Sequence, residues 1–87
     1  MKSLTTAEFW RAYRQLPPKL KVQARKTYAQ WRQNPRHPSL HFKKVGKALW
    51  SVRITGGYRA LAIKKGDDYY WFWIGPHDEY EALLGAG

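Results

Sequence analysis

Two arginines flank a glycine turn in the second half of the sequence, and their register decides what they can bind. Arg53 precedes the run Thr55-Gly56-Gly57, and Arg59 follows it. A three-residue loop would set the two arginines opposite each other on one face of a hairpin, whereas a two-residue loop would put them on opposite faces. Like charges that face each other cost stability unless an anion bridges them. Facing arginines would therefore indicate a phosphate site, and arginines on opposite faces would be ordinary solvated strand residues.

Near the C-terminal end, His77 and Tyr80 add groups that can move protons. Histidine changes charge near neutral pH and so suits a general acid or base, while a tyrosine can hold a phosphate, stack on a base or act as an acid. Both residues have simpler roles open to them, because His77 could order a turn after Pro76 and Tyr80 lies on a helical apolar stripe. With the arginines, these groups suit RNA cleavage, in which the 2′-OH of the RNA supplies the nucleophile.

Metal ligands are sparse in this sequence. No acidic cluster able to hold Mg²⁺ precedes the C-terminal third, so we expect chemistry without a metal or any other cofactor. His37 and His41 are four residues apart in a proline-broken loop, and with His77 they would make a three-histidine site that lacks carboxylate support. His41 is therefore a further candidate for proton transfer.

The charge is large and unevenly distributed. The 87 residues carry a net charge of +10, and residues 1–48 hold twelve of the 16 Lys and Arg against a single acid, Glu8. This asymmetry favours a partner with a phosphate backbone or an acidic protein surface over a surface that is basic for solubility alone. No cysteine is present, which excludes disulfides and thiolate metal sites. No apolar run approaches about 18 residues and no signal-peptide pattern opens the chain, so we expect a cytoplasmic protein with no membrane partner.

The first half of the chain predicts two amphipathic helices. Thr5 and Glu8 have the spacing of a capping box, which starts the first helix. The pair Pro17-Pro18 ends that helix, and Pro18 suits the first position of the next. The second helix runs over residues 19–33 and stops at Asn34-Pro35.

The second half predicts strands, with periodicity changing from 3.6 to 2 near residue 40. We expect strands over residues 40–45, 49–54, 58–65 and 69–74, a short helix over 78–84, and possible pairing of residues 1–4 at a sheet edge. The result is one α+β domain, residues 1–87, in which two N-terminal helices pack on an antiparallel sheet of four or five strands, followed by a short C-terminal helix. We expect the last three residues, 85–87, to be frayed. The predicted core comprises Leu16, Leu20, Ala24, Trp31, Phe42, Trp50, Val52, Leu61 and Phe72.

Several of these segments together resemble a known family. The two helices, the loop NPRHPSLH, the pair SVRI and YRAL, and the ending WFWIGPHDEY are similar to the RelE/ParE superfamily of bacterial type II toxins over nearly the whole chain. The resemblance implies a compact toxin that a separate antitoxin neutralises, in a hetero-oligomer of the two. It also implies one of two activities: ribosome-dependent cleavage of messenger RNA, as in the RelE branch, or inhibition of gyrase without catalysis, as in the ParE branch.

By position, the resemblance assigns roles to particular residues. Arg59 matches the arginine that RelE-like toxins place on the scissile phosphate, and Arg53 matches a second basic residue one strand earlier. His77 and Tyr80 lie where the family keeps its acid or base, a region in which family members differ. The RNA-binding candidates are Lys43, Lys44, Lys47, Arg36 and His41.

We therefore expect an endoribonuclease whose partners are an antitoxin, the ribosome and messenger RNA. Arg59 and Arg53 would hold the phosphate, and His77, Tyr80 or His41 would transfer the proton. A gyrase inhibitor without enzymatic activity and an inactive basic nucleic-acid-binding domain remain the alternatives.

Overall fold

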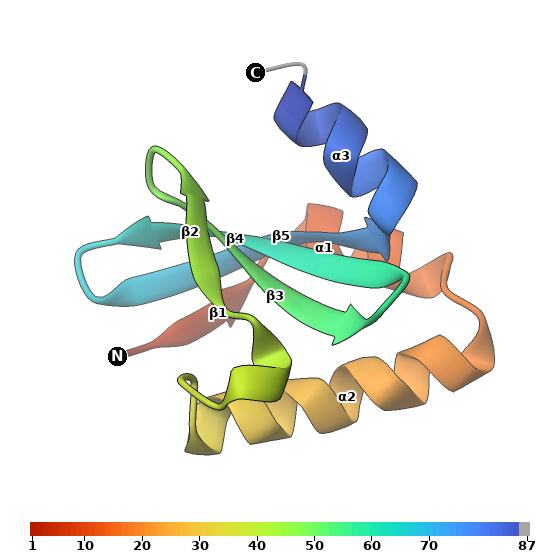
Figure 1. Cartoon of the computed structure of the whole chain (residues 1–87), viewed down its shortest axis with the longest axis horizontal. Coiled ribbons are helices and arrows are strands. Elements are labelled where there is room, and N and C mark those ends of the chain that lie inside the picture. Colours follow the sequence, from red (N-terminus) through yellow and green to blue (C-terminus); the bar gives the residue numbers. More distant parts are fainter. Residues whose placement is uncertain (86–87) are drawn as a thin grey trace.

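A five-stranded sheet organises the computed structural model, which describes residues 1–85 (Figure 1). The sheet has the order β1-β5-β4-β3-β2 and is antiparallel except at one edge, where β1 runs parallel to β5. This confirms the α+β architecture. None of the described helices is long and apolar enough to cross a membrane. Residues 86 and 87, which belong to the C-terminal end expected to fray, lie outside the described residues. In chain order the elements are β1 (Ser3–Thr5), α1 (Ala7–Arg14), α2 (Pro18–Gln33), the 3-10 helix η1 (Pro38–Leu40), β2 (Lys43–Gly46), β3 (Leu49–Thr55), β4 (Tyr58–Lys65), β5 (Asp68–Pro76) and α3 (His77–Gly85).

The start of α1 lies one residue later than the capping box predicts. Thr6 is the N-cap, and its side chain accepts a hydrogen bond from the Phe9 amide at 3.2 Å. The prediction of Thr5 was wrong because Thr5 still belongs to β1. Glu8 remains in the first turn, where hydrogen bonds from its own backbone amide and from the Thr6 hydroxyl lower the pKa of its carboxyl group.

The segment after α2 also differs from its prediction. Helix α2 begins at Pro18 and stops before Asn34, as predicted, but the strand expected from residue 40 starts only at Lys43. A 3-10 turn precedes it, and His41 adopts a left-handed backbone with φ of 45° that interrupts any extended run. Leu40, the last residue of that turn, is nonetheless buried in the core.

One face of the sheet packs against α2 through Trp31. The Trp31 ring is 1% exposed and makes edge-to-face contacts with Phe42, Tyr69 and Trp71. Such contacts add to the large apolar area that each aromatic ring buries. We call this side of the sheet the helix-pair face. Its buried members are Tyr13, Leu16, Ala24, Trp31, Leu40, Val52, Ile54, Ala60, Ala62, Tyr69, Trp71 and Ile74, with Leu20, Phe42 and Trp50 partly buried against them.

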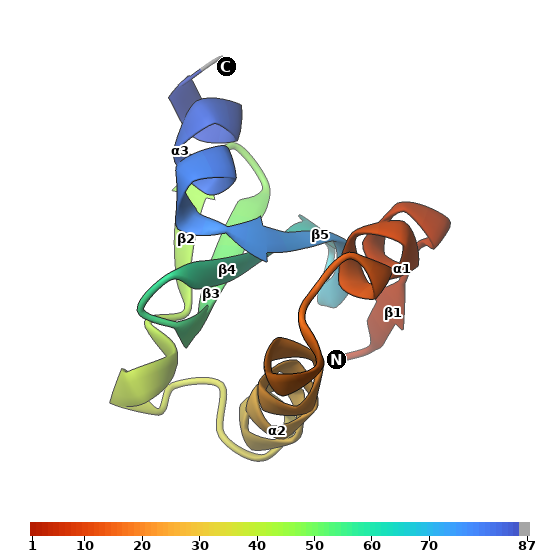
Figure 2. The same ribbon diagram turned by 90° about the vertical axis from the view of Figure 1, so that its right-hand side faces the viewer.

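The opposite side of the sheet lies under α3, and we call it the α3 face (Figure 2). Leu61 belongs to this face, beside its pairing partner Ser51, because successive strand residues point to opposite sides. Its assignment to the helix-pair core was therefore wrong. Phe72 is the extra residue of a bulge in β5 and is only half-buried.

The two N-terminal helices do not pack along each other. Helix α1 lies along β5, whereas α2 crosses β3 (Figures 1 and 2). Tyr13 connects them: its hydroxyl accepts a hydrogen bond from Arg25 Nε at 2.9 Å, and Lys21 lies 6.0 Å from its ring centroid. An apolar cleft remains between the helices.

The central role of Trp31 can be tested by two substitutions. Trp31→Ala should lower the free energy of unfolding by about 3–5 kcal/mol, because it leaves a large cavity. Trp31→Phe should cost clearly less, since the Trp31 indole N–H has no hydrogen-bond partner among the described residues and an unpaired buried donor is itself unfavourable. Urea unfolding measures both, with exposed Val22→Ala on α2 as the control. Equal losses for the two Trp31 variants would contradict this account.

Candidate functional site

The β3–β4 hairpin has the two-residue turn of one predicted register and the facing arginines of the other. Thr55 pairs with Tyr58 across a two-residue turn, yet Arg53 pairs with Arg59. A bulge at Ile54 supplies the missing residue, so the register shifts by one just beyond the turn. The two arginines therefore face each other on the α3 face.

Both guanidinium groups lie near the hairpin turn. Arg59 Nη1 donates to the Thr55 carbonyl at 3.0 Å. Arg53 Nη2 lies 3.7 Å from the position that a Cβ on Gly56 would take. Within residues 1–85, no carboxylate lies within 4.0 Å of either guanidinium group. Two neighbouring cations without a carboxylate partner could bind an anion such as phosphate.

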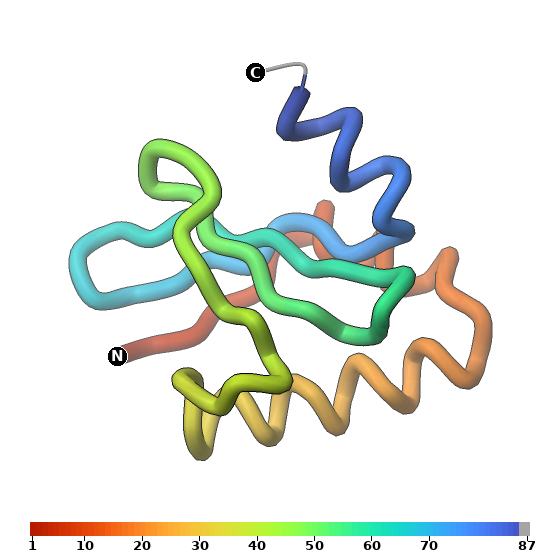
Figure 3. The backbone as a smooth tube through the Cα atoms, in the orientation of Figure 1, coloured from red at the N-terminus to blue at the C-terminus, as the bar shows by residue number. Residues whose placement is uncertain are grey.

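The first residue of α3 is attached to the same turn. The His77 amide donates to the Gly57 carbonyl at 2.8 Å, and Figure 3 shows the start of α3 beside the hairpin end. The His77 side chain is 36% exposed, and its Nε2 lies 3.5 Å from Glu81 Oε1, one helical turn later. The fold thus gathers three of the four predicted catalytic residues at one place. Sequence reasoning missed Glu81, although its i, i+4 spacing from His77 could have indicated it.

Tyr80 occupies a different environment from His77. It is 7% exposed, and its hydroxyl donates to Ser51 Oγ at 3.4 Å, where Ser51 is 1% exposed. Its ring centroid lies 5.5 Å from that of His77. This geometry favours the packing role for Tyr80, which holds α3 on the sheet and supports His77.

The predicted RNA-binding residues do not form one group. Lys43 pairs with Ser51 and so belongs to the α3 face with the arginines, whereas Lys44 pairs with Trp50 and belongs to the helix-pair face. Lys47 lies in the β2–β3 turn. Arg36 and His41 are exposed in the loop around η1, beside the end of α2 on the other side of the sheet (Figure 1).

A metal centre is not assembled from the ligand-type side chains of the described chain. No three His, Cys, Asp or Glu residues in the range 1–85 come together to hold an ion. The three-histidine arrangement considered from sequence is therefore not formed.

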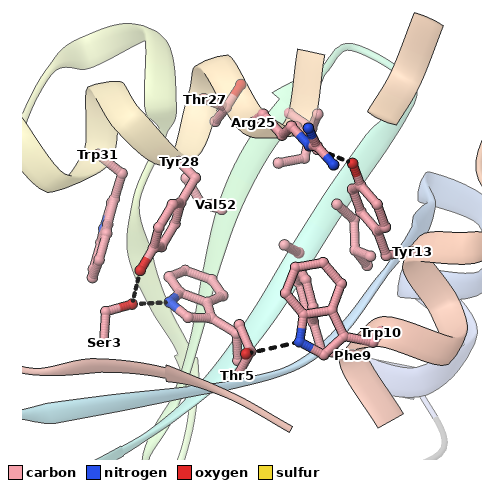
Figure 4. A pocket seen from close by; sticks show the side chains of 15 residues that line it. Ser3, Thr5, Phe9, Trp10, Tyr13, Arg25, Thr27, Tyr28, Trp31 and Val52 are labelled. Atoms are coloured by element: carbon pink, nitrogen blue, oxygen red, sulfur yellow. Dashed lines mark hydrogen bonds between the residues drawn. The ribbon is translucent and has the colours of Figure 1, made fainter. Parts of the chain in front are cut away.

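A second candidate surface is the apolar cleft between α1 and α2 (Figure 4). It has a volume of about 300 Å³, and its floor includes Trp31, Val52 and Ala60. Its exposed lining residues are Thr5, Trp10, which is 41% exposed, and Arg25. Sequence reasoning missed this cleft because residue periodicity does not show how far apart two neighbouring helices lie.

The paired arginines predict anion-dependent stability. Phosphate should raise the melting temperature of the protein above its value in chloride at equal ionic strength, because an anion that binds only the folded state stabilises it. Arg53→Ala and Arg59→Ala should each abolish most of this difference, whereas Lys65→Ala, an exposed cation elsewhere on β4, should not. Thermal denaturation in the two salts gives the result. A phosphate effect of equal size in all four proteins would locate the anion elsewhere.

The sequence was compared with known protein families. Residues 18–82, which are 65 of the 87, match the ParE-like toxin domain. No curated protein matches the sequence.

Solved structures agree on the fold. The chain superposes on the RelB–RelE antitoxin–toxin complex from Methanococcus jannaschii with a TM-score of 0.73 at 13% identity, covering 92% of this chain and 96% of that one. For the YoeB/ParE toxin from Agrobacterium tumefaciens the TM-score is 0.66 at 16% identity, with 88% and 99% covered. For the isolated E. coli RelE toxin it is 0.64 at 15% identity, with 99% and 98% covered. The chain therefore belongs to the ParE-like toxin domain family, within the RelE/ParE superfamily of toxins.

Proposed function

We propose that this toxin cleaves messenger RNA on the ribosome, with its active site at the hairpin end of the α3 face. The observation that carries the proposal is the pairing of Arg53 with Arg59 beside His77. A protein that only inhibited another protein by contact would not need two unpaired guanidinium groups and a histidine at one point. Lys43 on the same face adds a cation for the RNA backbone.

The proposed reaction uses the RNA's own nucleophile. The 2′-oxygen attacks the adjacent phosphorus, the bond from phosphorus to the 5′-oxygen breaks, and a cyclic phosphate and a 5′-hydroxyl result. Arg59, with Arg53 beside it, would hold the phosphate oxygens, since a planar guanidinium offers them two donors at once. These contacts strengthen as charge develops in the transition state.

Proton transfer is assigned to His77 in this proposal. Of the three candidates, His77 is partly exposed and joined by its amide to the hairpin turn between the arginines, Tyr80 is buried against Ser51, and His41 lies in the loop near α2. A histidine at this position can take the proton from the 2′-OH or deliver one to the departing 5′-oxygen. Glu81, 3.5 Å from Nε2, would orient the ring.

Substitution of the arginine tests the site directly. Arg59→Ala should reduce the rate of RNA cleavage on the order of 10²–10³-fold, because it removes a charge-assisted contact to the transition state. Arg59→Lys should also be impaired, since an ammonium group cannot reproduce the bidentate fork. Mapping of RNA 5′ ends after induction in cells measures the activity. A folded Arg59→Ala protein that still arrests growth and cuts RNA would show the site to be wrong.

Variants at the helix separate catalysis from packing. His77→Ala should cost roughly 10²–10⁴-fold in rate, whereas Tyr80→Phe should retain most activity and lose at most about 1 kcal/mol of stability with the hydroxyl. The assay is the same 5′-end mapping, with the free energy of unfolding measured in parallel. The reverse order of effects would assign proton transfer to Tyr80.

Gyrase inhibition is the second candidate function, because the matching domain family is ParE-like. It predicts growth arrest with intact messenger RNA and altered plasmid supercoiling. Plasmid topology measured in the same induced cells decides between the two functions.

We also propose that the partner is an acidic antitoxin and that the complex is cytoplasmic. The M. jannaschii relative was solved as an antitoxin–toxin complex, and the net charge of +10 favours an acidic partner. The cleft between α1 and α2 offers such a partner an apolar floor beside Arg25. Apolar side chains of the antitoxin would fill it.

Matched substitutions on the two helices test this contact. Trp10→Ala should weaken binding of the antitoxin encoded beside this protein at least about 30-fold, because a large aromatic at a cleft mouth has the character of a hot spot. Val22→Ala is the control, since Val22 is exposed on α2 but does not line the cleft. Calorimetric titration measures both affinities. Wild-type affinity in the Trp10 variant would place the antitoxin elsewhere.

A further inference from the structure

A groove crosses the open edge of β5 next to the paired arginines. Strand β1 pairs with β5 only as far as Trp71, so residues 72–76 have no neighbouring strand on that side. The end of α1 and the start of α3 flank the gap. The resulting groove has a volume of about 290 Å³, and its lining includes Gln15, Leu16, Trp73, Gly75, Pro76 and Glu79.

The indole of Trp73 lies over Gly75 within this groove. A Cβ added to Gly75 would lie 2.6 Å from Trp73 Cζ2, so the ring lies across the bare glycine. Gly75 pairs with Arg59, and directly opposed residues in a sheet lie about 5 Å apart. The indole therefore lies over the residue that pairs with Arg59 of the proposed phosphate site.

We propose that this groove binds the nucleobase next to the scissile phosphate and selects against uracil. This inference rests on the proposed RNA cleavage. Trp73 offers an aromatic surface for stacking, the contact that single-stranded RNA makes most often with proteins. The lining residues with polar side-chain groups besides the indole are Gln15, Tyr58 and Glu79.

The carboxylate gives the groove its selectivity. An ionised Glu accepts hydrogen bonds and donates none, so Glu79 pairs with the amino groups that adenine, cytosine and guanine carry. Uracil has no exocyclic amino group and presents carbonyl oxygens instead, which the carboxylate repels. Within residues 1–85, no cation lies within 4.0 Å of the Glu79 carboxylate, so it is not engaged in an ion pair there.

Glu79 and Asp78 share one ordinary role, and this makes Asp78 a matched control. Both are exposed acids in the first turn of α3, where they favour the helix dipole. Only Glu79 lines the groove. A difference between Glu79→Gln and Asp78→Asn therefore reports on the groove and not on the helix.

Mapped cleavage sites give the first test. Wild type should avoid uracil at the position beside the cut, and Glu79→Gln should reduce that bias on the order of tenfold, because glutamine can donate to uracil. Trp73→Leu and Gly75→Ala should weaken the bias too, the latter by displacing the indole. Asp78→Asn should keep the wild-type pattern. Cleavage with the same base preference in wild type and Glu79→Gln would overturn the proposal.

A binding measurement separates this proposal from the proposed function. The Trp73 indole N–H resonance, identified by its loss in Trp73→Phe, should shift on titration with AMP, CMP or GMP and much less with UMP. If wild type cuts no RNA but the resonance shows this selectivity, the groove stands and the proposed cleavage fails. If wild type cuts RNA while the resonance stays unchanged with all four nucleotides, the groove proposal fails alone.

Discussion

One extra residue in β3 sets the geometry on which the candidate site depends. Without the bulge at Ile54, the two-residue turn would send Arg53 and Arg59 to opposite faces of the sheet. The bulge is held from the other side, because the Ile54 side chain is 8% exposed within the helix-pair core. The position of a charged group on one face is thus maintained by apolar packing on the other. The repulsion between the two guanidinium groups is the cost of that arrangement, and a bound phosphate would offset it.

The sheet separates two surfaces of different chemistry. On the helix-pair face, α1 and α2 leave an apolar cleft, although the hydrogen bond from Arg25 to Tyr13 connects the two helices. On the α3 face, Arg53 and Arg59 lie at the hairpin end, and Lys43 is on the same face. A chain of 87 residues can support both surfaces because its large aromatic side chains fill the space between α2 and the sheet. In the proposed function, the antitoxin and the RNA therefore engage opposite sides of one thin layer.

Acidic residues are few in this protein, and three of them lie in α3, directly after the site. Glu81 contacts His77, Glu79 lines the groove at β5, and Asp78 lies in the first turn of the helix. Arginines suit phosphate oxygens, whereas carboxylates suit protons and base amino groups. The two charge types are thus placed where each could contact a different part of one nucleotide. A uniformly basic surface would bind RNA without such discrimination.

The sequence by itself determined the element types, most of their order and the candidate residues. Prolines, glycine turns and the change of period near residue 40 are local constraints on the backbone, and local constraints can be read from neighbouring residues. Only the tertiary structure decided which face each side chain occupies. The bulges at Ile54 and Phe72 each shift the strand alternation by one residue, and the one at Ile54 brought Arg53 opposite Arg59. A bulge is selected by packing between segments distant in the chain, as when Tyr80 reaches Ser51 across 29 residues. The packing energy between distant segments leaves no mark on the local residue pattern. The strand register, and with it the position of the site residues, therefore had to come from the fold.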